Sequence, residues 1–560
     1  MVANEYKPLI VQGDGSLLLD VHDPGFVEAR SYISPFAELE KSPEHMHTYR
    51  ITPLSLWNAA SAGLSKDTIL ERLSSYSRYP VPSNIEYMIS DLISRFGVIT
   101  LEASEDDEKT LYLKIKDNLI KQEIEKDIKH FPYLTPVSGG FYLPLLERGR
   151  VKQKLLTRGY PVEDLAPLKK GDPLIFKLRK QTRQGRDFIL RDYQIEARDS
   201  FYGMEQPGNG FGTMVLPCGA GKTVIGLSVM ERYQTKTLIL APNVASVHQW
   251  IDEILDKTDL TEEHIGEYSG DKKEIKPITI ATYQILVWRK DKTSDFPHFD
   301  IFLKANWGLV IYDEVHLLPA PVFRVTAEIQ AMKRLGLTAT LIREDGAEED
   351  VFSLVGPKRY DVPWKELEAK GFIAEANCYE IRIDLPETEK PIYAISDQRK
   401  KYRIAAENQY KIPIVKNLVD NHKEDSILII GQYLNQLQAI AKYMKAPLIT
   451  GKTSNKEREV IYNNFRAGKI RVLVVSKVAN FAINLPDASV AIQVSGSFGS
   501  RQEEAQRLGR ILRPKEKNSF FYTIISRYTI EETYGMNRQK FLAEQGYKYK
   551  IDFWDTKELI

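Results

Sequence analysis

A short glycine-containing loop constrains the fold of this chain more than any other feature. An apolar run, Met214 to Leu216, leads into residues 217–223, Pro-Cys-Gly-Ala-Gly-Lys-Thr, and residues 224–230 continue with apolar side chains at helical spacing. Glycines let backbone N–H groups approach a phosphate, and the N-terminus of the following helix favours negative charge. Leu216 stands where the longer phosphate-loop pattern has its first glycine, so the loop has the shorter Gly-x-Gly-Lys-Thr form. The loop predicts a strand, a phosphate-binding turn and a helix in a parallel α/β sheet.

Five residues of this loop are expected to bind ATP: Gly219, Ala220, Gly221, Lys222 and Thr223. In such loops the lysine reaches the β- and γ-phosphates, and the hydroxyl group of the last residue ligates Mg²⁺. The expected cofactors are therefore ATP and Mg²⁺.

An acidic pair follows another apolar run. Residues 309–312 have the pattern of a buried strand, and Asp313-Glu314-Val315-His316 comes next, about ninety residues after the glycine loop. An open α/β sheet places its site at the carboxyl ends of its strands. Alone, an Asp-Glu pair is more often a helix N-cap. After a phosphate loop we expect Asp313 to hold Mg²⁺ and Glu314 to polarise the attacking water.

Short apolar runs alternate with helical periodicity from Leu190 onward, which is typical of parallel α/β sheets. The runs that we interpret as buried strands are Leu238–Leu240, Ile278–Ala281, Leu309–Ile311, Ile427–Ile430, Val472–Val475 and Val490–Val494. A charged, helix-prone stretch at residues 397–411 separates the runs into two groups. We therefore predict an α/β fold with two lobes, at residues 188–375 and 376–555.

The first 187 residues lack this pattern. Capped apolar-periodic runs end at Gly97 and two alternating runs follow, so residues 1–115 are expected to form a small winged-helix-like domain of three helices and a hairpin. Residues 116–187 are interpreted as a short mixed α+β region, intermediate between the domains and resembling a DNA-recognition region, with a linker. Its basic end, residues 177–186, is interpreted either as a phosphate contact or as a solvated linker. The linker is favoured, because runs of charged residues are usually solvated.

Composition excludes several classes of protein. The 560 residues include 2 cysteines, too few for a disulfide framework, and the two do not form a Cys-x-x-Cys zinc pair. No apolar run approaches the roughly 18 residues that span a bilayer, and the N-terminus lacks a signal-like segment, so we expect no membrane partner. The expected location is the cytoplasm of a prokaryote, near the nucleoid, or the nucleus of a eukaryote. Basic and acidic residues number 77 and 76, so nucleic-acid binding must be argued from motifs.

An arginine-rich segment in the second lobe completes the predicted ATP site. Residues 502–513 have the sequence Gln-Glu-Glu-Ala-Gln-Arg-Leu-Gly-Arg-Ile-Leu-Arg. Arg510 and Arg513 are three residues apart and share one face of a helix, so they are expected to act as arginine fingers from across a cleft, with Gln506 in the same element. Taken alone, such a helix is more often a solvated surface. Closure of two lobes on ATP, and opening after hydrolysis, would step them along a strand.

Further motifs give the chain a specific resemblance. The segments Leu-Arg-Asp-Tyr-Gln (190–194), Leu-Ala-Pro (240–242), His-Gln-Trp (248–250), Thr-Tyr-Gln (282–284) and Leu-Thr-Ala-Thr (337–340) are similar to motifs of superfamily 2 helicases. The resemblance implies two RecA-like lobes and adenine recognition by Arg191 and Gln194. It also implies that segments 240–242, 248–250 and 282–284 hold the backbone of a nucleic-acid strand, with Thr282 among the contact residues. It also implies that His316, Thr338 and Thr340 couple hydrolysis to strand movement.

Within superfamily 2, the chain resembles the XPB family of DNA helicases. Arg343-Glu344-Asp345, directly after Thr-Ala-Thr, resembles that family's Arg-Glu-Asp element, which is implicated in engaging or separating the duplex, and residues 499–513 are also XPB-like. The resemblance implies ATP-dependent DNA unwinding with 3′ to 5′ polarity, in DNA repair or transcription-linked DNA opening. It further implies DNA as the substrate, a nuclease or a transcription or repair protein as partner, and thumb-like helices near residues 390–415.

One departure from the family leaves alternatives open. Where the family has Gly-Asp-Thr and Asp-Leu-Pro-Glu-Ala in its fifth motif, this chain has Ala-Asn-Phe at 479–481 and Asn-Leu-Pro-Asp-Ala at 484–488. The loss of two acidic groups favours a duplex translocase that remodels DNA without processive unwinding. A further alternative is an ATP-gated scaffold that recruits a partner, although a scaffold does not require a complete set of hydrolysis residues.

Overall fold

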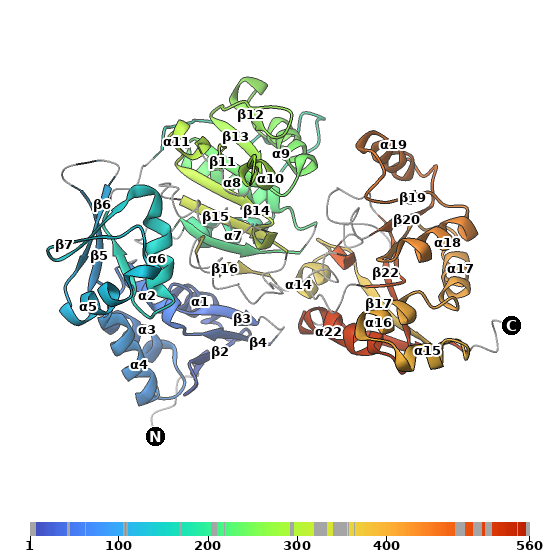
Figure 1. The fold of residues 1–560 in the computed structure, drawn as a ribbon, viewed down its shortest axis with the longest axis horizontal. Helices are drawn as coiled ribbons and strands as arrows, with labels where there is room; N and C mark the ends of the chain where they lie inside the picture. Colours follow the sequence, from blue (N-terminus) through green and yellow to red (C-terminus); the bar gives the residue numbers. More distant parts are fainter. Residues whose placement is uncertain are drawn as a thin grey trace. The chain divides into compact units, whose positions relative to one another are not determined.

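The fold of the chain divides into two units, one built mainly from residues up to Asp361 and the other mainly from Val362 onward. Figure 1 shows this computed structural model as a ribbon. The structure describes residues 7–41, 45–61, 63–104, 107, 110–166, 171–202, 210–217, 219–291, 296–298, 300–317, 333–339, 355–356, 358–362, 364–476, 488–496, 507–509, 518–545 and 547–555.

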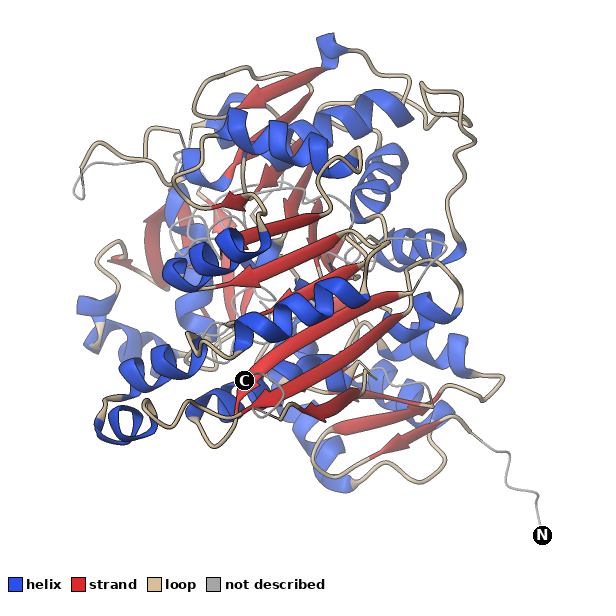
Figure 2. Ribbon diagram, turned by 90° about the vertical axis from the view of Figure 1, so that its right-hand side faces the viewer, coloured by secondary structure: helices blue, strands red, loops and turns tan. Residues whose placement is uncertain are grey.

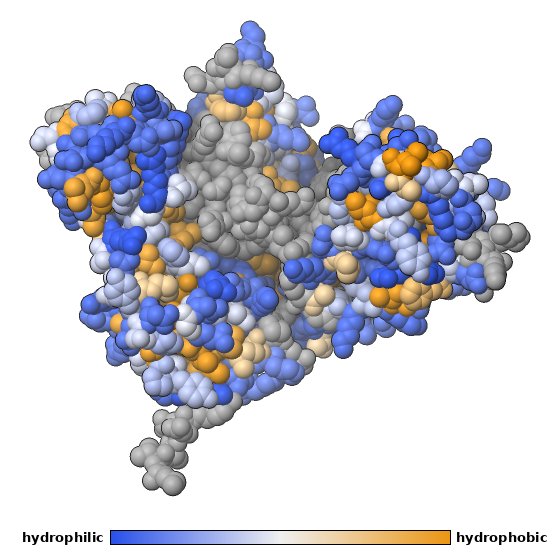
Figure 3. All heavy atoms as spheres, turned by 60° about the horizontal axis from the view of Figure 1, so that its bottom comes forward, coloured by the Kyte–Doolittle hydropathy of each residue, from blue (hydrophilic) through white to orange (hydrophobic). Residues whose placement is uncertain are grey.

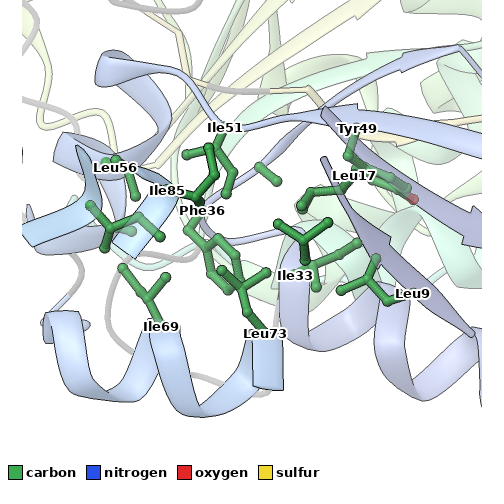
Figure 4. Close-up of a cluster of buried hydrophobic side chains, with 14 of the residues drawn as sticks. Leu9, Leu17, Ile33, Phe36, Tyr49, Ile51, Leu56, Ile69, Leu73 and Ile85 are labelled. Atoms are coloured by element: carbon green, nitrogen blue, oxygen red, sulfur yellow. The ribbon is translucent and has the colours of Figure 1, made fainter. Parts of the chain in front are cut away.

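The N-terminal part of the first unit contains a four-stranded antiparallel sheet of order β1-β2-β4-β3. Its strands are β1 (Leu9–Val11), β2 (Ser16–Asp20), β3 (Glu38–Lys41) and β4 (Met46–Arg50). Its helices are α1 (Phe26–Ile33), α2 (Pro53–Ser61), α3 (Lys66–Tyr76) and α4 (Ser83–Ser94). Leu9, Leu17, Ile33, Phe36 and Leu73 belong to the apolar core between the sheet and the helices (Figure 4). The expected winged-helix-like module did not include this sheet.

The hairpin expected after these helices is present as β5 and β6, but it belongs to a five-stranded sheet of order β7-β8-β6-β5-β9. The elements are β5 (Ile99–Ala103), β6 (Thr110–Ile115), α5 (Asn118–Lys126), β7 (Thr135–Val137), β8 (Gly140–Pro144), α6 (Arg148–Leu156) and β9 (Val162–Asp164). This sheet crosses residue 115, where we predict a domain boundary, and the boundary itself stays a prediction. Arg148 binds both carboxylate oxygens of Asp164, at 2.9 and 2.7 Å, and Lys152 lies 2.8 Å from one of them.

The rest of the first unit is a parallel seven-stranded sheet of order β12-β13-β11-β14-β15-β10-β16. Its strands are β10 (Phe211–Val215), β11 (Thr237–Ala241), β12 (Ile265–Tyr268), β13 (Ile278–Thr282), β14 (Leu309–Asp313), β15 (Lys333–Thr338) and β16 (Lys358–Asp361). Its helices are α7 (Asp192–Tyr202), α8 (Lys222–Tyr233), α9 (Val244–Lys257), α10 (Tyr283–Leu286) and α11 (Ile301–Lys304). β11 and β13 are buried along their whole length, as expected for strands covered on both faces.

The second unit contains another parallel seven-stranded sheet, of order β19-β20-β18-β21-β22-β17-β23. Its strands are β17 (Ala376–Ile383), β18 (Ile427–Gly431), β19 (Leu448–Ile449), β20 (Val472–Ser476), β21 (Val490–Gln493), β22 (Ser519–Ser526) and β23 (Tyr549–Phe553). Its helices are α14 (Trp364–Ala369), α15 (Lys390–Ile395), α16 (Gln398–Ala406), α17 (Lys411–Asn421), α18 (Leu434–Met444), α19 (Asn455–Arg466) and α22 (Ile530–Glu544). Figure 2 shows helices lying along the long strands nearest the viewer. The two parallel sheets confirm the predicted fold class.

The core of this second sheet contains a buried ion pair. Nζ of Lys411, at the start of α17, lies 2.8 and 2.9 Å from the carboxylate oxygens of Glu531 in α22, and it also donates to the carbonyl of Val494 at 3.0 Å. Both charged side chains are fully buried, so each depends on the other for compensation. The pair therefore fixes α17 against α22.

Helices α15 and α16 occupy the region in which thumb-like helices are expected, and their role stays a prediction. Across the described part of the chain, no helix has both the length and the apolar character needed to cross a membrane. Figure 3 shows hydrophilic residues over much of the viewed face, with hydrophobic residues in scattered patches.

Candidate active site

The glycine loop follows β10 and leads into α8, which begins at Lys222. Gly219 and Gly221 have φ angles of 85° and 78°, in the region that side chains with a Cβ rarely adopt. The N–H of Ala220 donates to the carbonyl of Pro217 at 3.2 Å, which closes a tight turn. The two glycines are therefore required by the backbone, as expected of a loop that approaches a phosphate.

The acidic pair lies at the carboxyl end of β14. Asp313 is the last residue of the strand, and Glu314 follows with a φ of 49°. A non-glycine residue in this left-handed region costs about 1–3 kcal/mol, and such residues are enriched at functional sites. β15 lies between β14 and β10 in the parallel sheet, so the strands that precede the acidic pair and the glycine loop end at the same edge, about 10 Å apart.

His316 links the acidic segment to the neighbouring strand. Its Nδ1 lies 2.6 Å from Oγ1 of Thr338, the last residue of β15, and 3.5 Å from a carboxylate oxygen of Glu314. His316 and Thr338 are both buried. Two residues that were expected to couple hydrolysis to strand movement are thus in direct contact, and one of them borders the expected catalytic carboxylate.

Two aromatic residues hold Asp313, and the sequence had not indicated either of them as part of the ATP site. The indole Nε1 of Trp250 donates to Oδ2 of Asp313 at 3.1 Å, and the hydroxyl group of Tyr283 donates to its backbone carbonyl at 2.9 Å. Burial, and then the negative charge of Asp313, holds the pKa of Tyr283 well above its usual value, so this hydroxyl stays a donor. The only signal for these residues was their place in segments 248–250 and 282–284.

Thr282, expected to contact a strand, is buried and forms the N-cap of α10. Its Oγ1 accepts a hydrogen bond from the N–H of Ile285 at 3.3 Å. Gln194, expected to read adenine, is also buried, and its side-chain oxygen accepts from the N–H of Arg191 at 3.0 Å. Both side chains therefore shape the start of a helix, α10 for Thr282 and α7 for Gln194, and their expected ligand contacts stay predictions.

The remaining predicted site residues lie outside the described part of the chain. These are Thr340, Arg343, Glu344, Asp345, Gln506, Arg510 and Arg513, together with Cys218 and the departing fifth motif at 479–487. Arg507 is described and is buried. It donates to the side-chain oxygen of Gln493 at the end of β21 and to the carbonyl of Ser495, the latter at 3.3 Å.

Two parallel seven-stranded sheets, one with a glycine loop and an acidic strand end on the same edge, define a two-lobed P-loop protein of the helicase type. Three family models match: "ERCC3/RAD25/XPB C-terminal helicase" over residues 367–556, "Helicase conserved C-terminal domain" over residues 9–133 and "Type III restriction enzyme, res subunit" over residues 187–343. The DNA 3′-5′ helicase XPB of Kineococcus radiotolerans is 49% identical over 548 residues, which cover 97% of this chain and 96% of that protein. The Mycobacterium tuberculosis protein of the same name is 48% identical over 548 residues, which cover 97% of this chain and 97% of that protein. The chain therefore belongs to the XPB family of superfamily 2 DNA helicases, which confirms the resemblance seen in the sequence.

A eukaryotic relative extends the similarity. The general transcription and DNA repair factor IIH helicase/translocase subunit XPB of Enterocytozoon bieneusi is 32% identical over 570 residues, which cover 98% of this chain and 93% of that protein. The similarity thus includes the two N-terminal sheets as well as the helicase lobes.

Proposed function

We propose that this chain is an ATP-driven DNA helicase that moves with 3′ to 5′ polarity. Two relatives that are nearly half identical over almost the whole chain carry the name DNA 3′-5′ helicase, which supports both the DNA substrate and the polarity. The observation that carries the proposal is the sheet edge that the glycine loop and the Asp313-Glu314 pair share. A carboxylate at that edge faces the place where an open α/β sheet binds its nucleotide.

Within this proposal, each residue of the ATP site has its own role. Lys222 neutralises the β- and γ-phosphates, while the positive φ angles of Gly219 and Gly221 let backbone N–H groups approach them. Glu314 orients the attacking water and accepts its proton. Arg510 and Arg513 are expected to act as arginine fingers that stabilise the charge that develops during transfer.

The described residues also fit a magnesium ion held jointly with the nucleotide. Among them, no group of three or more His, Cys, Asp or Glu side chains could hold a metal ion by itself. Mg²⁺ commonly binds through one or two protein oxygens together with substrate phosphates, and it keeps several waters. We propose that Asp313 and the hydroxyl group of Thr223 supply those oxygens, and the bound ion would neutralise phosphate charge.

Steady-state ATP hydrolysis tests the proposal directly. Rates would be measured without nucleic acid and with single-stranded DNA, duplex DNA and RNA, and Lys222→Ala would serve as the blank. Strong stimulation by DNA that is absent from the variant is the expected result. Hydrolysis that is indifferent to every nucleic acid would refute the motor function.

A second candidate is a duplex translocase that remodels DNA without processive unwinding. It is favoured by the neutral residues at 479–481 and 484, where the family has acidic groups in its fifth motif. A strand-displacement assay run beside a triplex-displacement assay separates the two functions. Displacement of a triplex-forming strand without separation of duplex strands would select the translocase.

The cellular role is also part of the proposal. We propose that the protein serves DNA repair or transcription-linked opening together with a nuclease or transcription partner, and acts in a prokaryotic cytoplasm. The relatives' names support an association with DNA transactions, and the N-terminal sheets are the natural place to search for a partner contact. The partner contact is tested by co-purification of the protein with and without residues 1–95. Recovery of the same bound proteins in both cases would contradict it.

A further inference from the structure

The acidic strand end is connected to two segments that the sequence assigns to strand contact. Asp313 receives one hydrogen bond on its carboxylate from Trp250 and another on its carbonyl from Tyr283. Trp250 lies in α9, which follows β11, and Tyr283 is the first residue of α10, which follows β13. In the sheet, β11 lies between β13 and β14. Trp250 thus connects Asp313 to the helix that follows β11, and Tyr283 connects it to the end of β13.

Trp250 also contacts the helix that begins at the glycine loop. It is buried, and Gly226 of α8 lies against its ring: a Cβ built on Gly226 would be 2.5 Å from Cη2 of Trp250. A residue larger than glycine at position 226 would push the ring away from α8. The indole therefore spans three elements, with its ring on α8, its backbone in α9 and its N–H on Asp313 of β14.

Tyr283 connects Asp313 to the segment that contains Thr282. The Thr282 hydroxyl group caps α10, and Tyr283 comes directly after it, so a shift of this cap moves the base of the tyrosine side chain. The ring is buried, which leaves little freedom to absorb such a shift. The movement would reach Asp313 through the 2.9 Å hydrogen bond to its backbone.

We propose that Trp250 and Tyr283 are positioning residues that connect nucleic-acid contact in the segments following β11 and β13 to Asp313. This rests on the proposed function, in which Asp313 ligates the metal ion, and on the expected contact of segments 240–242, 248–250 and 282–284 with the strand. An indole N–H can donate to one acceptor only, and on a carboxylate this bond is charge-assisted. The bond therefore fixes the orientation of the Asp313 carboxylate.

Two conservative variants remove these bonds and keep the rings. Trp250→Phe deletes the N–H, and Tyr283→Phe deletes the O–H. The same lobe offers matched controls: the buried Trp307 donates its N–H to the carbonyl of Ile301 at 2.9 Å, and the hydroxyl of the buried Tyr268 lies 3.0 Å from Nδ1 of His298. Trp307→Phe and Tyr268→Phe make the same chemical changes away from Asp313.

The first measurement is the affinity of the full chain for a fluorescent single-stranded DNA, with and without a non-hydrolysable ATP analogue and Mg²⁺. The ratio of the two dissociation constants is the coupling between the sites, and allosteric coupling is typically about 5- to 150-fold. In Trp250→Phe and Tyr283→Phe this ratio is expected to fall by about fivefold or more toward unity. A purely structural role would weaken DNA binding in both conditions and leave the ratio unchanged.

The second measurement is the Mg²⁺ concentration for half-maximal ATP hydrolysis. Trp250→Phe is expected to raise it by about tenfold, the lower end of the effect of removing a partner from a metal ligand, and Tyr283→Phe by less because it contacts the backbone. The inference would be overturned if both variants kept the ratio of dissociation constants of the parent protein, or if the Trp307 and Tyr268 controls lowered that ratio equally. Either outcome would leave the helicase function intact. If the parent protein hydrolysed ATP without any response to DNA, the proposed function and this inference would fall together.

Discussion

Replacing Thr338 by valine isolates the contact between His316 and the end of β15. Valine keeps the shape of threonine but removes the hydroxyl group that lies 2.6 Å from Nδ1 of His316. Losing one partner of a buried hydrogen bond costs about 1–3 kcal/mol. The Glu314 carboxylate lies 3.5 Å from the same nitrogen, so His316 is expected to turn toward the catalytic residue.

If this whole cost appears in the step that uses hydrolysis to move the strand, 1–3 kcal/mol corresponds to about a 5- to 150-fold loss of coupling. The assay compares ATP hydrolysed with base pairs opened on a forked duplex. Thr338→Ser is the control, because serine keeps the hydroxyl group and loses only a methyl group. We expect the serine variant to consume ATP per base pair as the parent does, and the valine variant to consume several times more. Equal coupling in the valine and serine variants would refute the role of the hydroxyl group.

Two further predictions concern buried charges. Burial raises the pKa of Asp164, but the charge of Lys152 and the hydrogen bonds from Arg148 outweigh this effect and hold that pKa below 3.8. The stability that this carboxylate contributes is therefore present above about pH 4 and is lost as the pH falls further. Thermal unfolding of Asp164→Asn should accordingly depend less on pH below about 4 than unfolding of the parent protein does. Lys411→Met leaves a buried carboxylate without its cation and is expected to lower the free energy of unfolding by about 3–5 kcal/mol. The control Lys416→Met removes a half-exposed ion pair and should lower it by less than about 1 kcal/mol. Urea unfolding measures both values, and equal losses of stability would contradict the argument for the buried pair.

The parallel sheets were predictable from sequence because their strands are covered on both faces and therefore appear as continuous apolar runs. The runs at 238–240, 278–281 and 427–430 became β11, β13 and β18. β17, Ala376–Ile383, was not indicated, because it carries Glu380 and Arg382 at alternate positions and its charged side chains pair with each other. The N-terminal strands were missed for a related reason. They are three to five residues long and pair with an antiparallel neighbour, so a pattern of apolar runs does not detect them.

The residues that position Asp313 could not be recognised from sequence for a different reason. Trp250 follows Val247 and precedes Ile254 at helical spacing on the buried face of α9, which is the pattern of an ordinary core residue. Its spacing gives no information about where the N–H points, because that depends on the identity of the strand packed beside it. The packing of α9 against the sheet brings the N–H to β14, and the absence of a side chain at Gly226 makes room for the ring. A buried aromatic residue in a helicase motif therefore contributes through its apolar ring to the core and through its single polar atom to the catalytic carboxylate, and substitutions that keep the ring while deleting that atom separate the two contributions.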